Sequence, residues 1–251
     1  MPDAATQTPI LAPFPAPTPA PPPSRLVDPH GREITYLRLS VTDRCDFRCV
    51  YCMDPDQRFA RRDLTLSPTE LLAVTRAFVG LGVRKVRLTG GEPLVRPDLI
   101  ELLGAIRALP GLAELVLTTN GSQLAARAHA IRAAGVRRIN ISLDTLRPER
   151  FRQITRKGDL AKVLNGIDAA IAAGFDRIKL NAVILRGRNH DEIPDLVGYA
   201  VDHGINISFI EEMPLGIIGD HDRAEAFYPS AQIRSDLGPH FELVPTTETT
   251  G

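Results

Sequence analysis

The 251-residue sequence has no tryptophan, only four lysines and only three cysteines. Three cysteines cannot pair completely, and all three lie between positions 45 and 52, so they cannot form the disulfide framework of a small secreted domain. No apolar run approaches the roughly 20 residues of a membrane-spanning helix. The N-terminus lacks the basic start and unbroken apolar stretch of a secretory signal. We therefore expect a cytoplasmic protein with no membrane partner.

No charge of one sign dominates, because lysine plus arginine and aspartate plus glutamate balance at 30 each. The chain as a whole is therefore not drawn to nucleic acid, although a local basic cavity is still compatible with this balance. The hydrophobic fraction of 43% and the charged fraction of 24% are those of an ordinary globular domain. The chain is long enough to bury a sizeable core.

The first segment, residues 1–24, is rich in proline, alanine and threonine. Nine of the first 23 residues are proline, which removes backbone donors and fixes φ. We expect this segment to be an extended, disordered tail.

From residue 34 onward, short apolar strands alternate with helical stretches, a pattern that favours a parallel sheet with right-handed crossovers. The pattern predicts strands near 34–41, 83–89, 113–119, 136–143, 176–184 and 205–211. It predicts helices near 67–81, 97–109, 122–134, 159–173, 191–203 and 230–237. Ser67, Pro68 and Glu70 give the first of these helices an N-cap, a proline at the first position and a capping-box glutamate.

The strands have one apolar and one polar face. In the first strand, Leu37 and Leu39 alternate with Arg38 and Ser40, and the next four strands follow the same rule. A doubly wound sheet would be apolar on both faces, and a closed eight-stranded barrel would pack its interior with apolar side chains. We therefore predict a partial barrel around a wet cavity. The alternative is a set of strands with one solvated face.

The three cysteines follow the first strand with the spacing C-x3-C-x2-C, at Cys45, Cys49 and Cys52. Three thiolates can hold a [4Fe–4S] cluster and leave one iron open for another ligand. A structural zinc site normally needs a fourth ligand, and the nearest histidines are His30 and His129. A thioredoxin-like redox pair would leave Cys45 unexplained, and inert buried thiols would not gather on so polar a loop. The glycines at 90 and 91 match neither phosphate-loop pattern.

The cysteine loop resembles the signature of the radical S-adenosylmethionine (SAM) superfamily, with Tyr51 as the aromatic residue before the last cysteine. The wider chain, over about residues 26–245, resembles the GTP 3′,8-cyclase family of molybdenum cofactor biosynthesis. The segments that carry this resemblance are LRLSVTDRCDFRCVYC, VRLTGGEPLVR, LTTNG, RRINISLDTL, KLNAVI and FIEEMPLG. The resemblance implies a partial (β/α)6 radical SAM barrel over residues 25–216, followed by the start of a truncated C-terminal region at 217–251.

The resemblance also assigns roles to individual positions. It implies that Cys45, Cys49 and Cys52 bind the cluster. The positions that it implies for SAM are Tyr51, Gly91, Ser142 and Met213. Those that it implies for GTP are Arg38, Arg87, Thr118 and Lys179, all of which fall on the polar strand face. Several cations on one inward face suit a triphosphate. No acid–base pair is assigned, although Glu92 and Asp144 lie in the same region.

The reaction implied is reductive cleavage of SAM to a 5′-deoxyadenosyl radical, which takes the C3′ hydrogen of GTP and leads to 3′,8-cyclo-7,8-dihydro-GTP. The implied partners are an electron donor such as flavodoxin or ferredoxin, cyclic pyranopterin monophosphate synthase acting on the product, and a second copy in a homodimer. A radical SAM enzyme acting on another substrate, such as a peptide, and a non-catalytic metal-binding module are the alternatives.

The sequence departs from the family pattern in one respect. The family carries a second [4Fe–4S] cluster, held by three cysteines in a C-terminal region, and this sequence has no cysteine after Cys52. We therefore expect residues 1–251 alone to bind GTP weakly and to form little cyclic product.

Overall fold

The computed structural model describes residues 25–213 and 218–247, so the proline-rich segment 1–24 and the boundary predicted at 216/217 lie outside the described residues. Six parallel strands form one sheet in chain order, and each falls within a predicted range. The strands are β1 (Tyr36–Ser40), β2 (Lys85–Thr89), β3 (Glu114–Thr119), β4 (Arg138–Ser142), β5 (Arg177–Ile184) and β6 (Asn206–Glu211). Within the described ranges β1 and β6 do not pair, so the predicted partial barrel is confirmed.

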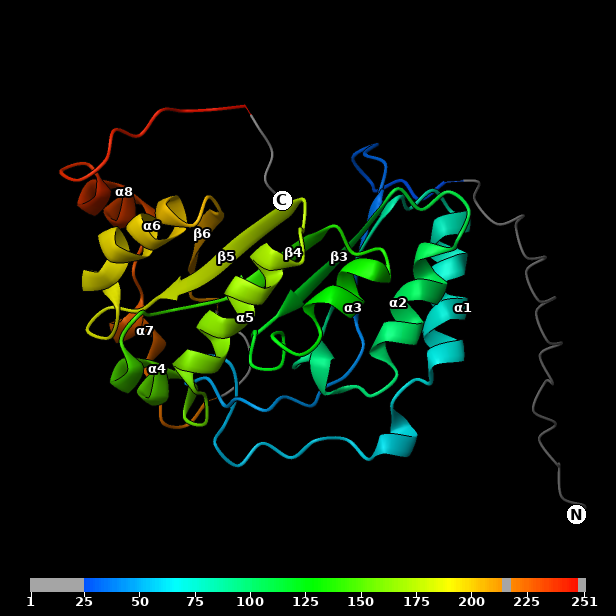
Figure 1. Cartoon of the computed structure of the whole chain (residues 1–251), viewed down its shortest axis with the longest axis horizontal. Coiled ribbons are helices and arrows are strands. Elements are labelled where there is room, and N and C mark those ends of the chain that lie inside the picture. Colours follow the sequence, from blue (N-terminus) through cyan, green and yellow to red (C-terminus); the bar gives the residue numbers. More distant parts are fainter. Residues whose placement is uncertain (1–24, 214–217, 248–251) are drawn as a thin grey trace, which may run out of the picture.

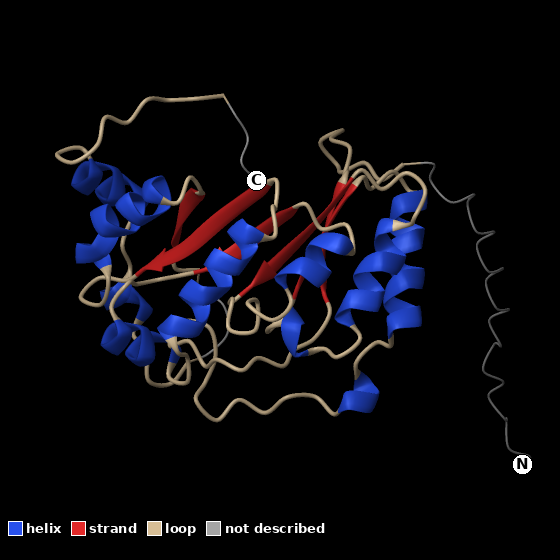
Figure 2. Cartoon of the chain, viewed as in Figure 1, coloured by secondary structure: helices blue, strands red, loops and turns tan. Residues whose placement is uncertain are grey.

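Helices connect the strands and pack on one face of the sheet, as Figures 1 and 2 show for α2, α3 and α5. The α-helices are α1 (Pro68–Gly80), α2 (Leu99–Arg107), α3 (Ala128–Ala133), α4 (Pro148–Thr155), α5 (Leu160–Ala172), α6 (Ile193–Asp202), α7 (Arg223–Ala226) and α8 (Ser230–Leu237). The short 3-10 helices are η1 (Arg62–Leu64), η2 (Pro93–Val95) and η3 (His190–Glu192). None of the helices in the described part of the chain is long and apolar enough to cross a membrane.

Strand alternation places the core between the sheet and these helices. Leu88, Ile139 and Leu180 are fully buried on the helix-covered face. The opposite face carries polar side chains, as the alternation predicts, including Arg87 and Asn140, both of which are largely buried. This buried polar face is the wall on which a ligand site can be built.

Three helices differ from the prediction, and one of them is the four-residue α7, which was not predicted. The helix predicted over 122–134 begins only at Ala128, because residues 122–127 form turns that start with a hydrogen bond from the Gly121 amide to the Thr119 hydroxyl. Helix α4 was not predicted, since only two of its apolar side chains, Phe151 and Ile154, are buried and the rest of its sequence is polar. This unpredicted helix contacts the cysteine loop.

Candidate active site

A cavity of about 420 Å³ lies at the carboxyl ends of the strands, the edge at which parallel α/β barrels place their chemistry. In Figure 1 the segment that carries the cysteines runs along this edge, where the strand arrows end. The lining includes the three cysteines together with Tyr51, Gly90, Gly91, Asn120, Ser142, Asp144, Asn181 and Val183. Chain segments that are far apart in sequence therefore meet at one site.

The cysteine loop is built around its own turns. The amides of Cys52 and Met53 both donate to the Cys49 carbonyl, at 2.9 and 3.2 Å. The Phe47 amide donates to the Cys45 sulfur at 3.4 Å. Cys45 and Cys49 are half-buried and Cys52 is exposed, and none is in a disulfide. All three thiols are thus available to a ligand in the cavity.

The loop is also anchored to its neighbours. Asp46 accepts hydrogen bonds from the Asn120 side chain at 2.7 Å and the Ser122 hydroxyl at 2.6 Å, both after β3. On the other side, the ring of Phe47 meets that of Phe151 on α4 edge to face, with centroids 5.8 Å apart. The loop is therefore held between β3 and α4.

The donor set fits an iron–sulfur cluster. Burial raises the pKa of the Cys45 thiol from 9.0 to about 11, and it raises the pKa of Cys49 well above 9.0. Thiolates in such surroundings need a bound cation, which iron provides. No three His, Cys, Asp or Glu side chains in the described ranges gather closely enough to hold a single metal ion. Three thiols on one loop fit a [4Fe–4S] cluster, which can take one thiolate on each of three irons and leave the fourth iron open.

The Gly90–Gly91 segment runs beside the cysteine loop with no room between the backbones. The Gly91 amide donates to the Thr42 carbonyl and the Glu92 amide to the Arg44 carbonyl, both at 2.7 Å. A Cβ on Gly91 would lie 2.3 Å from the Arg44 carbonyl oxygen, and one on Gly90 equally close to that of Thr42. Glycine is required here because the two backbones touch.

Glu92 fixes this segment to the end of β3. Its buried carboxylate accepts hydrogen bonds from the Thr119 hydroxyl at 2.7 Å, the Asn120 amide at 2.6 Å and the Leu94 amide at 2.9 Å. Burial outweighs these bonds and raises the pKa of Glu92 from 4.5 to about 7. Glu92 therefore fixes the Gly90–Gly91 segment, which lines the cavity, to the end of β3.

The Glu92 carboxyl predicts a pH dependence of stability. Its pKa is higher in the folded chain, so the folded state holds the proton more tightly, and the unfolding free energy falls as pH rises from about 4.5 through about 7. The full shift in the pKa of Glu92 corresponds to roughly 3 kcal/mol of unfolding free energy. We expect urea unfolding between pH 5 and pH 8 to show this loss in the wild type and a shallower loss in Glu92→Gln. The remainder comes from Asp144, whose pKa burial raises from 3.8 to about 6. Equal slopes in the two proteins would contradict the prediction.

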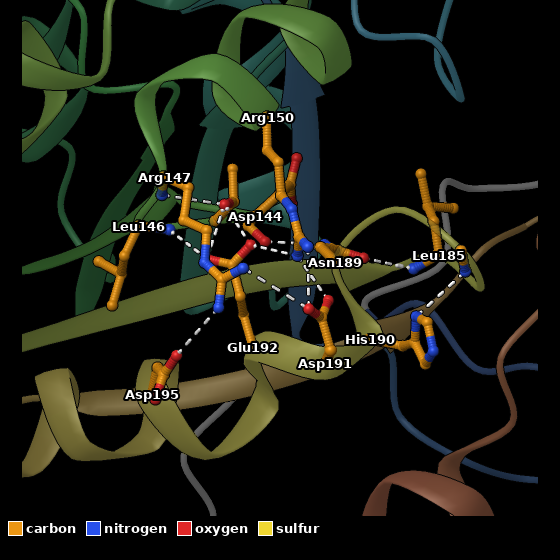
Figure 3. A network of polar contacts seen from close by, with 12 residues as sticks. Asp144, Leu146, Arg147, Arg150, Leu185, Asn189, His190, Asp191, Glu192 and Asp195 are labelled. Atoms are coloured by element: carbon orange, nitrogen blue, oxygen red, sulfur yellow. Dashed lines mark hydrogen bonds and ion pairs between the residues drawn. The ribbon is translucent and has the colours of Figure 1, made fainter.

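Asp144 connects the cysteine loop to β5. Its carboxylate accepts hydrogen bonds from the Tyr51 hydroxyl at 2.7 Å and from the Val183 amide at 2.8 Å. The Asn189 side chain donates to the Asp144 and Val183 carbonyls, at 2.7 and 2.8 Å, and so locks the two strand ends together (Figure 3). Tyr51 is thereby held against the cavity wall.

An ion-pair network behind Asp144 stiffens the loop between β4 and α4. The side chain of Glu192, which is 1% exposed, accepts hydrogen bonds from Thr145, the Leu146 amide and Arg150. Figure 3 shows Arg147 and Arg150 reaching toward acidic side chains in η3 and at the start of α6. The network lies outside the cavity lining, so it supports the site without touching a ligand there.

The polar strand face continues below the cavity as a cationic layer. Arg87 donates to the Tyr36 hydroxyl at 2.5 Å and to the Thr118 hydroxyl at 3.0 Å. Arg38 pairs with Arg87 in the sheet register. Burial lowers the pKa of Lys179, as do the nearby charges of Arg87, Arg138 and Lys85. Glu114 forms ion pairs with Lys85 and Arg138 at 3.2 and 2.8 Å. The cations of this face outnumber that one carboxylate, and the resulting positive charge favours a bound anion.

Comparison with known proteins identifies the family. Residues 39–200 match the radical SAM superfamily. The chain is 60% identical over 227 residues to the GTP 3′,8-cyclase of Pseudomonas entomophila, covering 90% of this chain and 68% of that one. It is 56% identical over 225 residues to the enzyme of the same name from Pseudomonas fluorescens, with the same coverage. The chain belongs to the GTP 3′,8-cyclase family. Membership implies one [4Fe–4S] cluster and SAM. It favours a cyclase over the two alternatives, a peptide-modifying radical SAM enzyme and a non-catalytic metal-binding module.

Solved structures share the fold of this radical SAM protein at low sequence identity. SuiB of Streptococcus suis, solved with S-adenosylmethionine bound, has a TM-score of 0.66 and 19% identity, covering 80% of this chain and 45% of that one. Methylornithine synthase has a TM-score of 0.59 and 18% identity, with coverages of 76% and 56%. At this identity the likeness concerns the fold alone.

The structure brings most of the predicted site residues together. The three cysteines, Tyr51, Gly91 and Ser142 line the cavity, and Arg87, Thr118 and Lys179 lie on the adjoining strand face. Met213 is 56% exposed and is not part of the lining among the described residues. Asn181 and Val183 line the cavity without having been assigned a role, although their place on the polar face of β5 could have indicated one.

Proposed function

We propose that the cavity is the cofactor site of a GTP 3′,8-cyclase and that the adjoining cationic face is its nucleotide site. Three cysteines would hold the cluster, with SAM placed against Tyr51, Gly91 and Ser142. Met213 remains a predicted SAM contact. When bound, the cluster and SAM supply a 5′-deoxyadenosyl radical, and the family's reaction joins C3′ of the GTP ribose to C8 of guanine. The observation that carries the proposal is the meeting of three thiols and a glycine backbone in one cavity.

The protein's own residues bind and orient the two ligands and exclude water from the site. The half-buried backbone of Gly91 lines the cavity without a side chain, so a ligand can lie close to it. The Ser142 hydroxyl and the Asn181 amide offer hydrogen bonds from the strand ends. Arg38, Arg87 and Lys179 would neutralise a triphosphate, with Thr118 and Tyr36 fixing the Arg87 side chain. Holding both ligands in one orientation is the main contribution of the protein to such chemistry.

Further partners follow from the proposal. Cys52 is exposed, so a one-electron donor such as flavodoxin or ferredoxin can approach the cluster loop. Cyclic pyranopterin monophosphate synthase would consume the product, and a homodimer and a cytoplasmic location belong to the same proposal. The family's second cluster would need ligands other than the three cysteines of this sequence. We therefore expect little cyclised product from residues 1–251 by themselves.

GTP binding tests the nucleotide site. We expect Lys179→Met to weaken GTP binding roughly tenfold or more, because it removes one charge-assisted contact and part of the positive field. Calorimetry under anaerobic conditions measures the change. The wild-type protein, given SAM, a strong reductant and GTP deuterated at C3′, should transfer deuterium from GTP to 5′-deoxyadenosine.

The matched control is Lys162→Met, which removes an exposed lysine on α5, away from the strand face. Equal GTP affinity in the two variants would place the nucleotide elsewhere. SAM cleavage without label transfer, even after a C-terminal segment with three cysteines is joined to the chain, would favour a radical SAM enzyme with another substrate.

A further inference from the structure

Arg156 has a backbone conformation that side-chain-bearing residues rarely adopt. It follows α4 with φ of 59° and ψ of −34°, and no other non-glycine residue in the described ranges has a positive φ. The Lys157 amide donates to the Thr155 carbonyl at 2.7 Å, which closes a three-residue γ-turn centred on Arg156. Such turns with positive φ are rare and strained, and strained residues of this kind gather at functional sites.

The side chain of Arg156 spans the cysteine loop. Its Nη1 donates to the Arg48 carbonyl at 2.9 Å and to the Met53 carbonyl at 3.1 Å, the residues that directly flank the Cys49–Cys52 segment. The side chain is only 18% exposed. One guanidinium therefore ties the two ends of the segment that carries two of the three thiols.

The backbone at the end of α4 reinforces this connection. The Arg48 amide donates to the Thr155 carbonyl at 3.0 Å, and the Val50 amide to the Ile154 carbonyl at 2.9 Å. The γ-turn is what allows the chain to present these carbonyls and the Arg156 guanidinium to the same loop. A glycine would adopt this φ without strain, but it would offer no donor to the loop.

The remaining guanidinium nitrogen connects the loop to a distant part of the chain. Nη2 of Arg156 forms an ion pair with Asp220 at 2.5 Å, in the segment that follows β6. The hydrogen bond from Arg156 lowers the pKa of Asp220. Arg156 therefore contacts the cysteine loop and Asp220 at once.

We propose that Arg156 is a positioning residue that holds the cysteine loop in its cluster-binding shape and, through Asp220, makes that shape depend on the segment after β6. This inference rests on the proposed role of the loop as the cluster site. It assigns to the strained turn a function in the same reaction: presenting Cys49 and Cys52 at a fixed spacing.

The test compares Arg156→Gly with Lys157→Gly, which removes an exposed neighbouring cation and introduces the same residue. We expect amide hydrogen exchange in residues 48–53 to become roughly tenfold faster in Arg156→Gly and to stay unchanged in Lys157→Gly. The midpoint of global unfolding should change little in Arg156→Gly, because relief of the strained turn offsets part of the stability lost with the side-chain contacts. Asp220→Asn should give an intermediate increase in exchange, and Arg156→Lys should restore part of the protection.

A second readout uses the reconstituted protein. Arg156→Gly should release iron to a chelator several-fold faster and should change the electron paramagnetic resonance signal obtained on adding SAM. Exchange in residues 48–53 that matches the Lys157→Gly control would overturn the proposal. A fall in global stability that accounts for the whole increase in exchange would also overturn it. Because exchange is measured in the metal-free chain too, a wild type that takes up no iron would count against the proposed function alone.

Discussion

Replacing Cys49 with alanine is expected to abolish iron and sulfide binding, whereas the wild-type chain should take up about four irons after anaerobic reconstitution, the content of one [4Fe–4S] cluster. Cys49 is the central thiol of the loop, and its carbonyl also closes the turn at Cys52 and Met53. The substitution leaves that backbone turn in place, so a loss of iron and sulfide can be attributed to removal of the thiolate. Cys45→Ala and Cys52→Ala should have the same result.

The control for this experiment is Asp56→Ala, an exposed substitution in the same loop that removes no thiol. Iron and sulfide analysis with the visible absorption spectrum measures the outcome, and the metal-free proteins should show similar unfolding midpoints. Stoichiometric zinc without sulfide in the wild type would contradict the assignment of the three cysteines to a [4Fe–4S] cluster.

Much of the site could be predicted because two patterns in the sequence are simple: the spacing of the cysteines and the alternation of apolar and polar residues along the strands. Cysteine spacing placed three thiols on one loop, and strand alternation placed Arg87 and Lys179 on the polar face of the sheet. In both cases the chemistry depends on residues that are close in sequence or on a repeat of two. The structure adds the cavity that joins them.

The contacts that hold the cysteine loop could not be predicted in the same way. Asp144 meets Tyr51 across 93 positions of sequence, and Arg156 meets Arg48 across 108. Pairings at this separation depend on how β4, α4 and β5 pack, which no local pattern encodes. Helix α4 has eight residues and only two buried apolar side chains, Phe151 and Ile154, so its sequence holds too few apolar repeats to predict a helix. The supports of the site therefore emerge only from the fold.

Glu92 illustrates the same limit at shorter range. The sequence places it after two glycines, where it could be a ligand or an acid. In the structure its carboxylate accepts hydrogen bonds from the end of β3 and from Leu94, and Glu92 is not among the residues that line the cavity. The sequence shows that a carboxyl group stands at position 92. The role of that group depends on the burial that β3 and η2 provide.

The close approach at Gly91 leads to the last prediction: Gly91→Ala should reduce SAM cleavage to 5′-deoxyadenosine about 100-fold. A Cβ there would lie 2.3 Å from the Arg44 carbonyl oxygen and 2.6 Å from that of Asp43. The cysteine loop must therefore move by roughly 1 Å, and a displacement of this size can cost about 100-fold in rate. The larger Gly91→Val should block cleavage, since its side chain would push the cysteine loop further from the Gly90–Gly91 segment. Gly80→Ala is the matched control, because a Cβ at Gly80 on α1 meets nothing within 4 Å. Cleavage should be measured with a strong reductant after confirming equal iron content, which separates misplacement of SAM from loss of the cluster. Undiminished cleavage in Gly91→Val would show that SAM does not lie against this backbone.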